Sequence, residues 1–449
     1  MNARPAALAA ALSLICGAVS ADPVQRSLRP AERPAAGVRM VTLAAATVAP
    51  QEALRPARRP AEATPAATPA APQAGAEHAG FAGWVREFRP RALAAGIDAG
   101  TFDRAFAGAR YDPDVIARDR TQAEFTKTLW QYLDSAVSDT RIANGRAALA
   151  EHGAVLQRIE EAYGVDKEVV AAIWGMESAY GSFRGTKPIV GSLATLAFEG
   201  RRAAFFEDQL IAALRILQNG DTGPETMTGS WAGAMGHTQF IPTSYEALAV
   251  DFTGDGRRDI WSDDPTDALA STAHYLAEHG WTLGMPWGVE VQLPADFDYS
   301  LADRSIEKMP SDWARLGVRG VDGAPVRDFG SASLLLPAGA DGVAFLISRN
   351  FRAIERYNAA DAYVIGVGHL SDRLRGSGPF RGGWPADERA LTFDERQELQ
   401  RRLTAAGYDT GGVDGRIGPN TLAALRGFQR AAGLKPDGYA SLSVLDRLR

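Results

Sequence analysis

The chain has 449 residues and a formal net charge of −6, and 46% of its residues are hydrophobic. This length is enough for two or three domains, and the apolar fraction is enough for a large core. Because there is no basic excess to neutralise phosphates, the composition argues against nucleic acid as a partner.

Residues 1–21 have the pattern of a secretory signal peptide. An apolar stretch at 6–15 is too short to span a bilayer, and small residues up to Ala21 suit cleavage after that position. The only cysteine, Cys16, lies in this segment. Its alternative use is lipid attachment in an outer-membrane lipoprotein, but the three residues before it match such sites poorly. We therefore expect a periplasmic protein whose mature form lacks cysteine.

Residues 22–78 are dominated by Ala, Pro and Arg and contain hardly any aromatic side chain. Such a composition cannot bury enough apolar surface to offset the entropy lost on ordering. We expect a disordered tether here.

Apolar residues at helical spacing predict a mainly helical domain over 79–385. The expected helices span 81–88, 99–107, 122–136, 139–163, 169–181, 203–218, 243–249, 265–279, 343–355 and 359–372. Alternating side chains predict a strand at 288–294 and a shorter one at 334–337, which indicates a small β insertion between about 285 and 340. The predicted fold class is mainly α, or α+β.

A Gly/Pro-rich stretch at 376–385 is typical of a linker, and residues 389–449 form a separate small module. Helices are expected at 394–406 and 420–432, with a third that opens at Asp437-Gly438. The dipeptides Asp414-Gly415 and Asp437-Gly438 form a loose internal echo. A three-helix module without a catalytic constellation is expected to bind rather than to catalyse.

Glu177 is the one ionisable group in an apolar run, and helical spacing places Val170, Ile173 and Trp174 on its face. An apolar setting raises the pKa of a carboxyl group and favours its protonated form, which is what a general acid needs near neutral pH. The alternative is a structural glutamate at the edge of a core helix, tied to a buried arginine or to a backbone N–H.

The stretch from Asp251 to Asp259 resembles the opening of a calcium loop. Oxygen-bearing side chains stand at its first, third, fifth and ninth positions and glycine at its sixth, as Asp251, Thr253, Asp255, Asp259 and Gly256. Ser262 stands where a bidentate glutamate usually closes such a loop, so Asp263, Asp264 or Asp267 must supply those oxygens. The alternative is a solvated Asx turn. The metal would be structural.

Glycine and other small residues are dense between Gly229 and Tyr245, with Gln239 among them, and this pattern fits either close packing or a ligand site. His237 has no spaced metal partners and receives no role. Other catalytic schemes lack their motifs, since no nucleophile elbow, zinc-binding His-Glu-x-x-His or phosphate loop is present. No second carboxylate stands out near Glu177 in the sequence.

Residues 80–375 resemble the lytic murein transglycosylase B family. The matching stretches are Gly-Met-Glu177-Ser-Ala-Tyr-Gly, Leu-Ala-Thr-Leu-Ala-Phe-Glu-Gly-Arg201-Arg202, Gly-Ala-Met-Gly-His-Thr-Gln239-Phe-Ile-Pro-Thr-Ser-Tyr, the Asp251 loop, and Arg356-Tyr357-Asn358 with Tyr363. Residues 389–449 are similar to the three-helix peptidoglycan-binding domain of cell-wall enzymes, chiefly through residues 399–403 and 413–425.

The resemblance implies a lysozyme-like helical fold and cleavage of the β-1,4 bond between N-acetylmuramic acid and N-acetylglucosamine. It implies that Glu177 acts first as acid and then as base, with help from the substrate's acetamido group, and that 1,6-anhydromuramic acid ends result. No cofactor is implied for catalysis, and a structural Ca²⁺ is implied at the Asp251 loop. Peptidoglycan glycan strands and stem peptides are the implied partners.

The resemblance also implies roles for individual residues. Ser230 and Asn358 would hydrogen-bond the acetamido region, and Gln239 would contact glycan near the acid. Arg201 and Arg202 would face muramyl peptide. Sugar subsites would be lined by Tyr132, Phe240, Tyr357 and Tyr363. The implied calcium ligands are Asp251, Thr253, Asp255, the Arg257 carbonyl and Asp267.

Two alternatives remain open at this point. One is a peptidoglycan-binding scaffold that has lost turnover, although retention of Glu177, Ser230, Gln239 and Asn358 argues against it. The other is a hydrolytic muramidase of the same fold, which would need a second carboxylate to position water.

Overall fold

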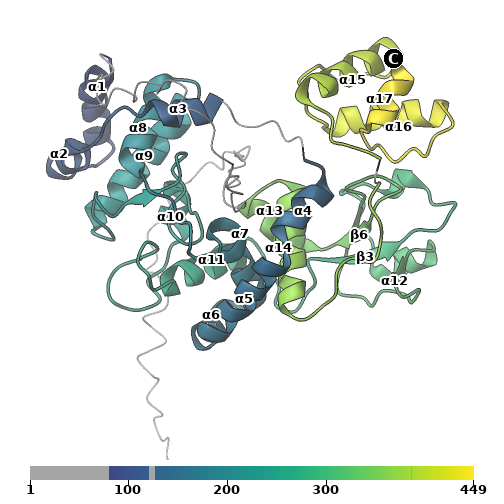
Figure 1. The fold of residues 1–449 in the computed structure, drawn as a ribbon, viewed down its shortest axis with the longest axis horizontal. Helices are drawn as coiled ribbons and strands as arrows, with labels where there is room; N and C mark the ends of the chain where they lie inside the picture. Colours follow the sequence, from purple (N-terminus) through teal and green to yellow (C-terminus); the bar gives the residue numbers. More distant parts are fainter. Residues whose placement is uncertain (1–79, 121–126, 386) are drawn as a thin grey trace, which may run out of the picture. The chain divides into compact units, whose positions relative to one another are not determined.

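A computed structural model describes residues 80–120, 127–385 and 387–449 (Figure 1). The expected signal peptide and tether, residues 1–78, lie outside the described residues, as does the first part of the helix expected at 122–136. Within the described part of the chain, no helix combines the length and apolar character needed to cross a membrane.

The described chain is mostly helical, which confirms the predicted fold class. Its α-helices are α1 Phe81–Ala94, α2 Ala99–Ala107, α3 Pro113–Arg120, α4 Leu129–Ala136, α5 Asp139–Glu151, α6 Gly153–Tyr163, α7 Lys167–Ser178, α8 Ile189–Glu199, α9 Ala203–Asn219, α10 Pro242–Leu248, α11 Thr266–Glu278, α12 Pro310–Arg315, α13 Arg349–Tyr357, α14 Asp361–Leu374, α15 Phe393–Ala405, α16 Pro419–Ala431 and α17 Leu442–Leu448. Its strands are β1 Lys187–Pro188, β2 Thr228–Gly229, β3 Gly288–Gln292, β4 Arg319–Gly320, β5 Ser333–Leu335 and β6 Ala344–Ile347.

Two predicted helices were wrong in extent. The single helix expected at 139–163 is two helices, α5 and α6, because His152 between them leaves helical geometry. The helix expected at 343–355 begins only at Arg349, since the apolar residues before it form strand β6. Its true start is a cap, in which the Ser348 hydroxyl accepts a hydrogen bond from the Asn350 N–H. Helices α3, α8 and α12 were not predicted.

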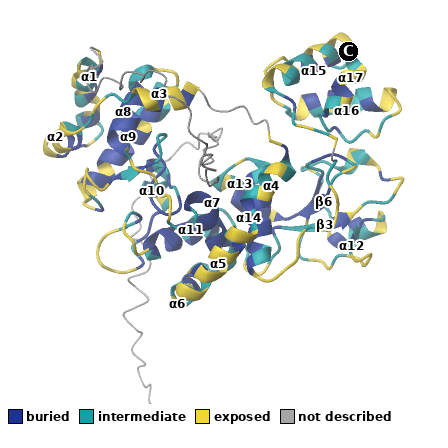
Figure 2. Cartoon of the chain, viewed as in Figure 1, coloured by how far each residue is buried: buried dark blue, intermediate teal, exposed yellow. Residues whose placement is uncertain are grey.

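Helix α7 lies in the middle of the larger hydrophobic core. Every residue from Val169 to Ser178 is buried, and Figure 2 shows this helix in the dark blue of buried residues. A helix that is apolar on all sides must be covered on all sides, and α7 packs against α5, α6, α11 and α14. The segment that carries Glu177 is thus walled in by neighbouring helices.

A second core joins α1, α2, α8, α9 and α10, with Phe88, Leu193, Leu210, Leu214 and Tyr245 fully buried in it. Tyr357 and Tyr275 pack against both cores from the side. Tyr357, at the end of α13, therefore lies where the two hydrophobic cores meet.

The predicted β insertion is a four-stranded antiparallel sheet in the order β4-β3-β6-β5. Val289 pairs with Leu346, and Leu346 pairs on its other side with Leu334. One face covers a third cluster around the fully buried Trp313, and Phe345 on β6 joins the α7 core. The sheet is thereby joined to the helical domain by apolar contact.

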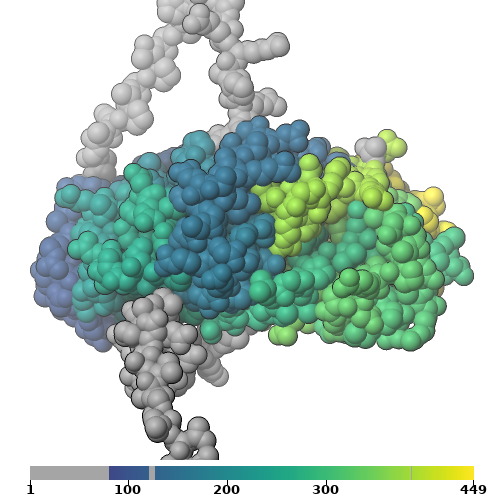
Figure 3. Space-filling view, turned by 90° about the horizontal axis from the view of Figure 1, so that it is seen from below, coloured from purple at the N-terminus to yellow at the C-terminus, as the bar shows by residue number. Residues whose placement is uncertain are grey.

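Residues 376–385, predicted to be a plain linker, are packed against the helical domain. The Phe380 ring stacks on His369 with centroids 3.8 Å apart, and Trp384 stacks on Trp130 at 6.0 Å. The backbone N–H groups of Arg381 and Gly382 donate to the Glu290 carboxylate. In Figure 3 the blue surface of the α4–α5 segment lies against the yellow-green surface of α14 and the chain after it.

The C-terminal module, residues 389–449, contains the three predicted helices, α15, α16 and α17. They share a core of Leu399, Leu403, Leu425 and Leu445, each of which is fully buried. A capping box starts α15, in which the Thr392 hydroxyl and the Glu395 carboxylate each accept a backbone N–H of the other residue.

Helices α5 and α7 approach closely because each carries a glycine at their contact. A Cβ on Gly145 would lie 2.3 Å from the Tyr180 hydroxyl oxygen, and a Cβ on Gly175 would lie 2.4 Å from the same ring. The two glycines leave a slot for the Tyr180 side chain, which follows directly on the Glu177 segment.

We predict that Gly145→Ala destabilises the helical domain, because the added methyl group overlaps the Tyr180 ring and Leu374. Overpacking of this kind costs about 1–3 kcal/mol. The measurement is the urea midpoint of unfolding. Gly153→Ala is the matched control, since no atom lies within 4 Å of its added Cβ. Equal midpoints for the two variants would contradict the slot.

Candidate active site

Glu177 lies one residue before the end of α7, and 8% of it is exposed. The Tyr363 hydroxyl donates a hydrogen bond to its Oε1 atom at 2.6 Å. Burial raises the pKa of Glu177 to about 7, against an opposing effect of the Tyr363 hydrogen bond. Near neutral pH the group is therefore present both as the acid and as the carboxylate, which suits proton transfer in both directions.

The turn after Glu177 is strained and firmly held. Ala179 and Tyr180 adopt left-handed backbone conformations, with φ of 49° and 59°. Such residues cost roughly 1–3 kcal/mol each and persist only where the surroundings enforce them. The Tyr180 hydroxyl donates to the Arg141 carbonyl at 3.0 Å, and the Gly181 N–H donates to the Ser178 hydroxyl at 2.9 Å. These contacts fix the direction in which the chain leaves α7.

His237, which received no role from the sequence, joins this helix to the glycine-rich segment. The Trp174 indole donates to His237 Nδ1 at 3.1 Å, so the ring proton is on Nε2, which donates to the Ser262 carbonyl at 2.8 Å. The Ser178 hydroxyl donates to the His237 carbonyl at 2.6 Å. Burial lowers the pKa of His237, which favours this neutral form. In the sequence, the only indication that His237 has a role was its position two residues before Gln239.

The glycine-rich segment lies directly against the loop that follows Glu177. Strand β1 pairs with β2, and a Cβ on Gly185 would lie 2.2 Å from the Gly229 carbonyl carbon. Ser230 accepts a hydrogen bond from the Ala234 N–H through its hydroxyl. Gln239 has a left-handed φ of 56°, and its amide donates to the carbonyls of Arg184 and Gly236. The backbone thus brings Ser230 and Gln239 to the loop that follows α7.

Three of the four predicted aromatic residues surround the Glu177 end of α7. Tyr363 contacts the carboxyl group directly, and the Tyr357 hydroxyl donates to the Thr238 carbonyl at 2.6 Å. Burial first, and then the charge of Glu177, raise the pKa values of Tyr132 and Tyr357. Neutral phenols are therefore maintained around the acid.

Phe240, the fourth of these aromatic residues, lies behind Tyr357. Only 3% of this residue is exposed, and its ring packs edge-on against Tyr357 and Tyr275, each with a centroid distance of 5.9 Å. Because the ring is enclosed by other aromatic side chains, it supports Tyr357 from behind and does not form part of the accessible surface.

Asn358 and the two arginines have partners within the protein. The side-chain Oδ1 atom of Asn358 accepts the Ala360 N–H at 3.1 Å, in the turn between α13 and α14. Arg202 and Arg201 lie 2.8 Å and 3.6 Å from the carboxylate of Asp119, whose side chain is 6% exposed. The arginines thus neutralise a buried acid, a role that the sequence did not suggest. Contacts with a stem peptide would be additional to it.

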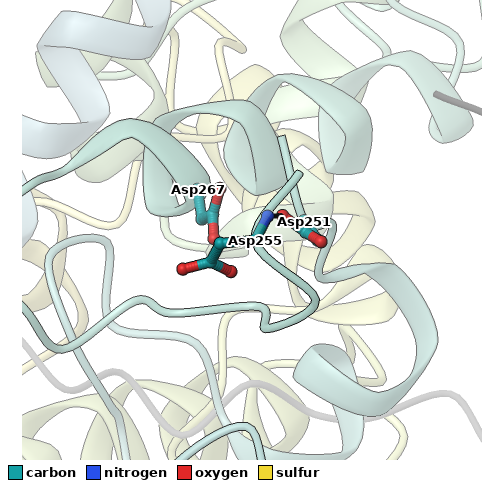
Figure 4. A group of neighbouring side chains, drawn as sticks. All are labelled: Asp251, Asp255 and Asp267. Carbon is teal, nitrogen blue, oxygen red and sulfur yellow. Dashed lines mark hydrogen bonds between the residues drawn. The ribbon is translucent and has the colours of Figure 1, made fainter. Parts of the chain in front are cut away.

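Asp251 and Asp255 of the predicted calcium loop come together with Asp267, which the family resemblance implied as the closing residue. One oxygen from each lies within 4.8 Å of the others, and Figure 4 shows Asp267 reaching from the first turn of α11 toward the loop that carries the other two. Asp267 accepts the N–H groups of Phe252, Thr253 and Asp259. Its pKa is raised by burial and then by the nearby charge of Asp251, despite these hydrogen bonds.

This cluster fits a hard divalent cation. Three carboxyl groups converge, and among the described residues no lysine or arginine forms an ion pair with any of them. Convergent oxygen ligands with uncompensated negative charge are the environment that Ca²⁺ prefers. Thr253 and Arg257 lie on the same loop, and the Arg257 N–H donates to Asp255.

Comparison with known proteins identifies the class to which this fold and site belong. The profile of the transglycosylase SLT domain family matches residues 80–372, and that of a putative peptidoglycan binding domain matches residues 393–448. The chain therefore belongs to the SLT-domain family of lytic transglycosylases.

Individual relatives agree with this. The chain is 33% identical over 253 residues to membrane-bound lytic murein transglycosylase B of Escherichia coli, a match that covers 54% of this chain and 66% of that protein, slightly less than two thirds. It resembles SltB3 from Pseudomonas aeruginosa, solved with NAG-anhNAM-pentapeptide, at 53% identity and a TM-score of 0.80, covering 82% of this chain and 99% of SltB3.

A more distant relative was solved with calcium. It is the E. coli lytic transglycosylase Slt35, with 28% identity and a TM-score of 0.56, and the match covers 66% of this chain and 92% of Slt35.

We predict that Glu177→Gln stabilises the protein in a pH-dependent manner. The raised pKa means that the unfolded chain loses this proton first as the pH rises. Wild-type stability is therefore lost between pH 4.5 and about 7, relative to a variant that cannot ionise. The expected difference above pH 7 is on the order of 3 kcal/mol.

Thermal unfolding of both proteins from pH 4 to pH 8 tests this prediction. Glu225→Gln, at an exposed position before β2, is the control for a change of charge. A constant stability difference between the Glu177 variant and wild type across this range would show that the carboxyl group is not held in an apolar site.

Proposed function

We propose that this protein cleaves the β-1,4 bond between N-acetylmuramic acid and N-acetylglucosamine in peptidoglycan and leaves 1,6-anhydromuramic acid ends. The observation that carries the proposal is the solitary acid. Within the part of the chain that the structure describes, the side chain hydrogen bonded to Glu177 is that of Tyr363, and no carboxylate contributes to its pKa shift. Two-carboxylate hydrolysis needs a second carboxylate, and among the described residues none is hydrogen bonded to Glu177.

One group can carry out both proton transfers in this reaction. Glu177, protonated, gives its proton to the glycosidic oxygen as the C1–O bond breaks, and the substrate's acetamido oxygen stabilises C1. The Glu177 carboxylate then takes the proton of the C6 hydroxyl as O6 bonds to C1. The proton returns to Glu177 and no water is consumed. A pKa near 7 suits both steps.

The neighbouring residues would orient the sugar. In this proposal Ser230 and Asn358 hydrogen-bond the acetamido region, and Gln239 contacts glycan beside the acid. Tyr132, Tyr357 and Tyr363 offer aromatic surface, and the Tyr363 hydroxyl keeps the Glu177 carboxyl in one orientation. Arg201 and Arg202 would contact the stem peptide through those guanidinium N–H groups that are not bonded to Asp119. The complex of SltB3 with NAG-anhNAM-pentapeptide supports this assignment of substrate.

We propose that Ca²⁺ has a structural role. Asp251, Asp255 and Asp267 would hold it, together with Thr253 and the Arg257 carbonyl. The ion would neutralise the converging carboxylates and stiffen the loop that leads to Ser262, whose carbonyl accepts the His237 ring proton. The reaction itself needs no cofactor in this proposal.

The domain organisation and location complete the proposal. Residues 79–385 form the catalytic domain, and residues 389–449 bind peptidoglycan and keep the enzyme on its substrate. A signal peptide at 1–21 and a tether at 22–78 would place the mature protein in the periplasm. The name of the E. coli relative, which refers to murein, supports an envelope location.

We predict that Glu177→Gln abolishes release of anhydromuramic fragments from purified peptidoglycan, because the amide can neither donate nor accept the required proton. The expected loss is roughly 10²–10⁴-fold. Mass spectrometry of the released fragments is the measurement, with Glu225→Gln as a control that retains wild-type activity.

The same experiment separates the alternatives. Reducing ends in place of anhydro ends would mean that water attacks C1, as in a muramidase. Folded wild-type protein that sediments with sacculi but releases no fragments would be a binding scaffold. Activity of the glutamine variant within about tenfold of wild type would remove Glu177 from the mechanism.

We predict that chelation by EGTA lowers the melting temperature and that added Ca²⁺ restores it, because a ligand bound only to the folded state stabilises by about 2.7 kcal/mol at one hundred times its Kd. Asp255→Asn should abolish this response. Asp322→Asn, at an exposed turn of the β insertion, should retain it. A melting temperature indifferent to EGTA in wild-type protein would refute the calcium site.

A further inference from the structure

The C-terminal module contains the same hydrogen-bonded motif twice. In the first copy, Gln400 of α15 donates to Asp414 Oδ1 and accepts the Gly415 N–H, and Asp414 Oδ1 also accepts the Arg416 N–H. Gln400 is 1% exposed. Both glycines that follow the aspartates, Gly415 and Gly438, have left-handed φ angles, 70° and 78°.

In the second copy, Gln429 of α16 takes the place of Gln400. It donates to Asp437 Oδ1 and accepts the Gly438 N–H, and Asp437 Oδ1 accepts the Tyr439 N–H. Gln429 is 3% exposed. In each copy these bonds occupy the same carboxylate oxygen, Oδ1, so the other oxygen faces away from the motif.

The two copies differ in what meets that second oxygen. Asp437 Oδ2 accepts the backbone N–H of Ala340, from the loop between β5 and β6, at 2.8 Å. Lys435 beside it pairs with Asp341 of the same loop. The second motif thus holds the turn at Ala340 and Asp341 through a backbone N–H group and an adjacent charge.

In the first copy the corresponding place is a hollow of about 360 Å³, which is within the range of small-ligand sites. Its walls include Asp414, Arg416, Asn420 and the loop glycines Gly411 and Gly412. The loop before Asp414, residues 406–413, is longer than its counterpart 432–436, and this extra length forms one wall.

The charges in this hollow suit the end of a peptide. Asp414 Oδ2 has no hydrogen bond within the described chain and can accept an N–H, as Asp437 does. Arg416 is exposed, and the first residues of α16, which begins at Pro419, line the hollow, at the helix end whose N–H groups lack helical partners. A guanidinium group together with a helix N-terminus favours a carboxylate.

We propose that this hollow binds the carboxylate end of a peptidoglycan stem peptide. The last peptide N–H donates to Asp414 Oδ2, and the terminal carboxylate lies against Arg416 and the start of α16. The proposal rests on the proposed function for the choice of peptidoglycan, and it goes beyond it by naming the peptide terminus, not the glycan, as what the C-terminal module recognises.

The test is calorimetric titration of the full-length protein with the peptide L-Ala-γ-D-Glu-L-Lys-D-Ala-D-Ala and with its C-terminal amide. Asp414→Asn keeps the Oδ1 acceptor for Gln400 and Arg416 but presents an NH₂ group where the ligand N–H would bind. Arg416→Gln removes the cation, and its guanidinium has no partner within the described residues. Arg401→Gln, on the exposed face of α15, is the matched control.

We expect each of Asp414→Asn and Arg416→Gln to weaken binding of the free-acid peptide by about tenfold or more, because each variant loses one charge-assisted contact. Arg401→Gln should bind as wild type does. Amidation of the peptide's C-terminus should weaken its binding to the wild-type protein by a similar factor. It should weaken binding to the Arg416→Gln variant little further, because both changes remove the same contact.

Three results would overturn the proposal: equal binding of acid and amide by wild type, undiminished binding by both variants, or binding of N-acetylglucosamine oligosaccharides that Asp414→Asn abolishes. If Asp414→Asn unfolds the module, the comparison of the acid and amide peptides in binding to Arg416→Gln tests the proposal without it. If the peptide fails to bind in this way while the protein still releases anhydromuramic fragments, the proposed function stands and only this inference is rejected. Peptide binding at Asp414 without such fragments would reject the proposed function only.

Discussion

The arrangement of this protein depends on keeping the carboxyl group of Glu177 out of water. A charged carboxylate in an apolar site is costly, and a dry site is also what raises its pKa to about 7. Helix α7 is therefore covered on all sides, and Tyr363 supplies the one side-chain hydrogen bond to the acid among the described residues. The same burial that weakens the fold makes the acid useful for proton transfer, as expected where function opposes stability.

The supports of this site come from distant parts of the chain and form one connected set. Tyr180 is held in a left-handed turn by helix α5, while His237 joins α7 to the Ser262 carbonyl. The Ser262 N–H in turn donates to Asp259, whose own N–H donates to Asp267 of the aspartate cluster. Stiffening that cluster would thus restrict the segment that positions Gln239, even though no aspartate of the cluster contacts Glu177.

Sequence reasoning reached most of the helices and placed Asp251 and Asp255 on one loop, because periodicity and loop spacing are local signals, whereas Asp267 was implied only by the family resemblance. It failed where tertiary packing decides. The apolar run at 344–347 fits a helix or a strand equally well, and pairing with β3 makes it a strand. Phe240, which the resemblance places at a sugar subsite, is enclosed by Tyr357 and Tyr275, a packing that no local pattern reveals. His237 links α7 to the Ser262 carbonyl, a role that its sequence spacing does not indicate, since Trp174 and Ser262 lie beside it only in the folded chain.

The docked segment at 376–385 has a consequence for how the enzyme moves over its substrate. Phe380 and Trp384 fix this strap to the helical domain, so only a short connection separates it from α15, and the contacts of Asp437 and Lys435 with the β5–β6 loop hold the module on its other side. Residues 385–392, even fully extended, reach roughly 30 Å. A wall polymer held by the C-terminal module would stay near the helical domain, at an effective concentration in the millimolar range. A short connection of this kind would favour successive cleavages of neighbouring glycosidic bonds over single cleavages at distant places in the sacculus.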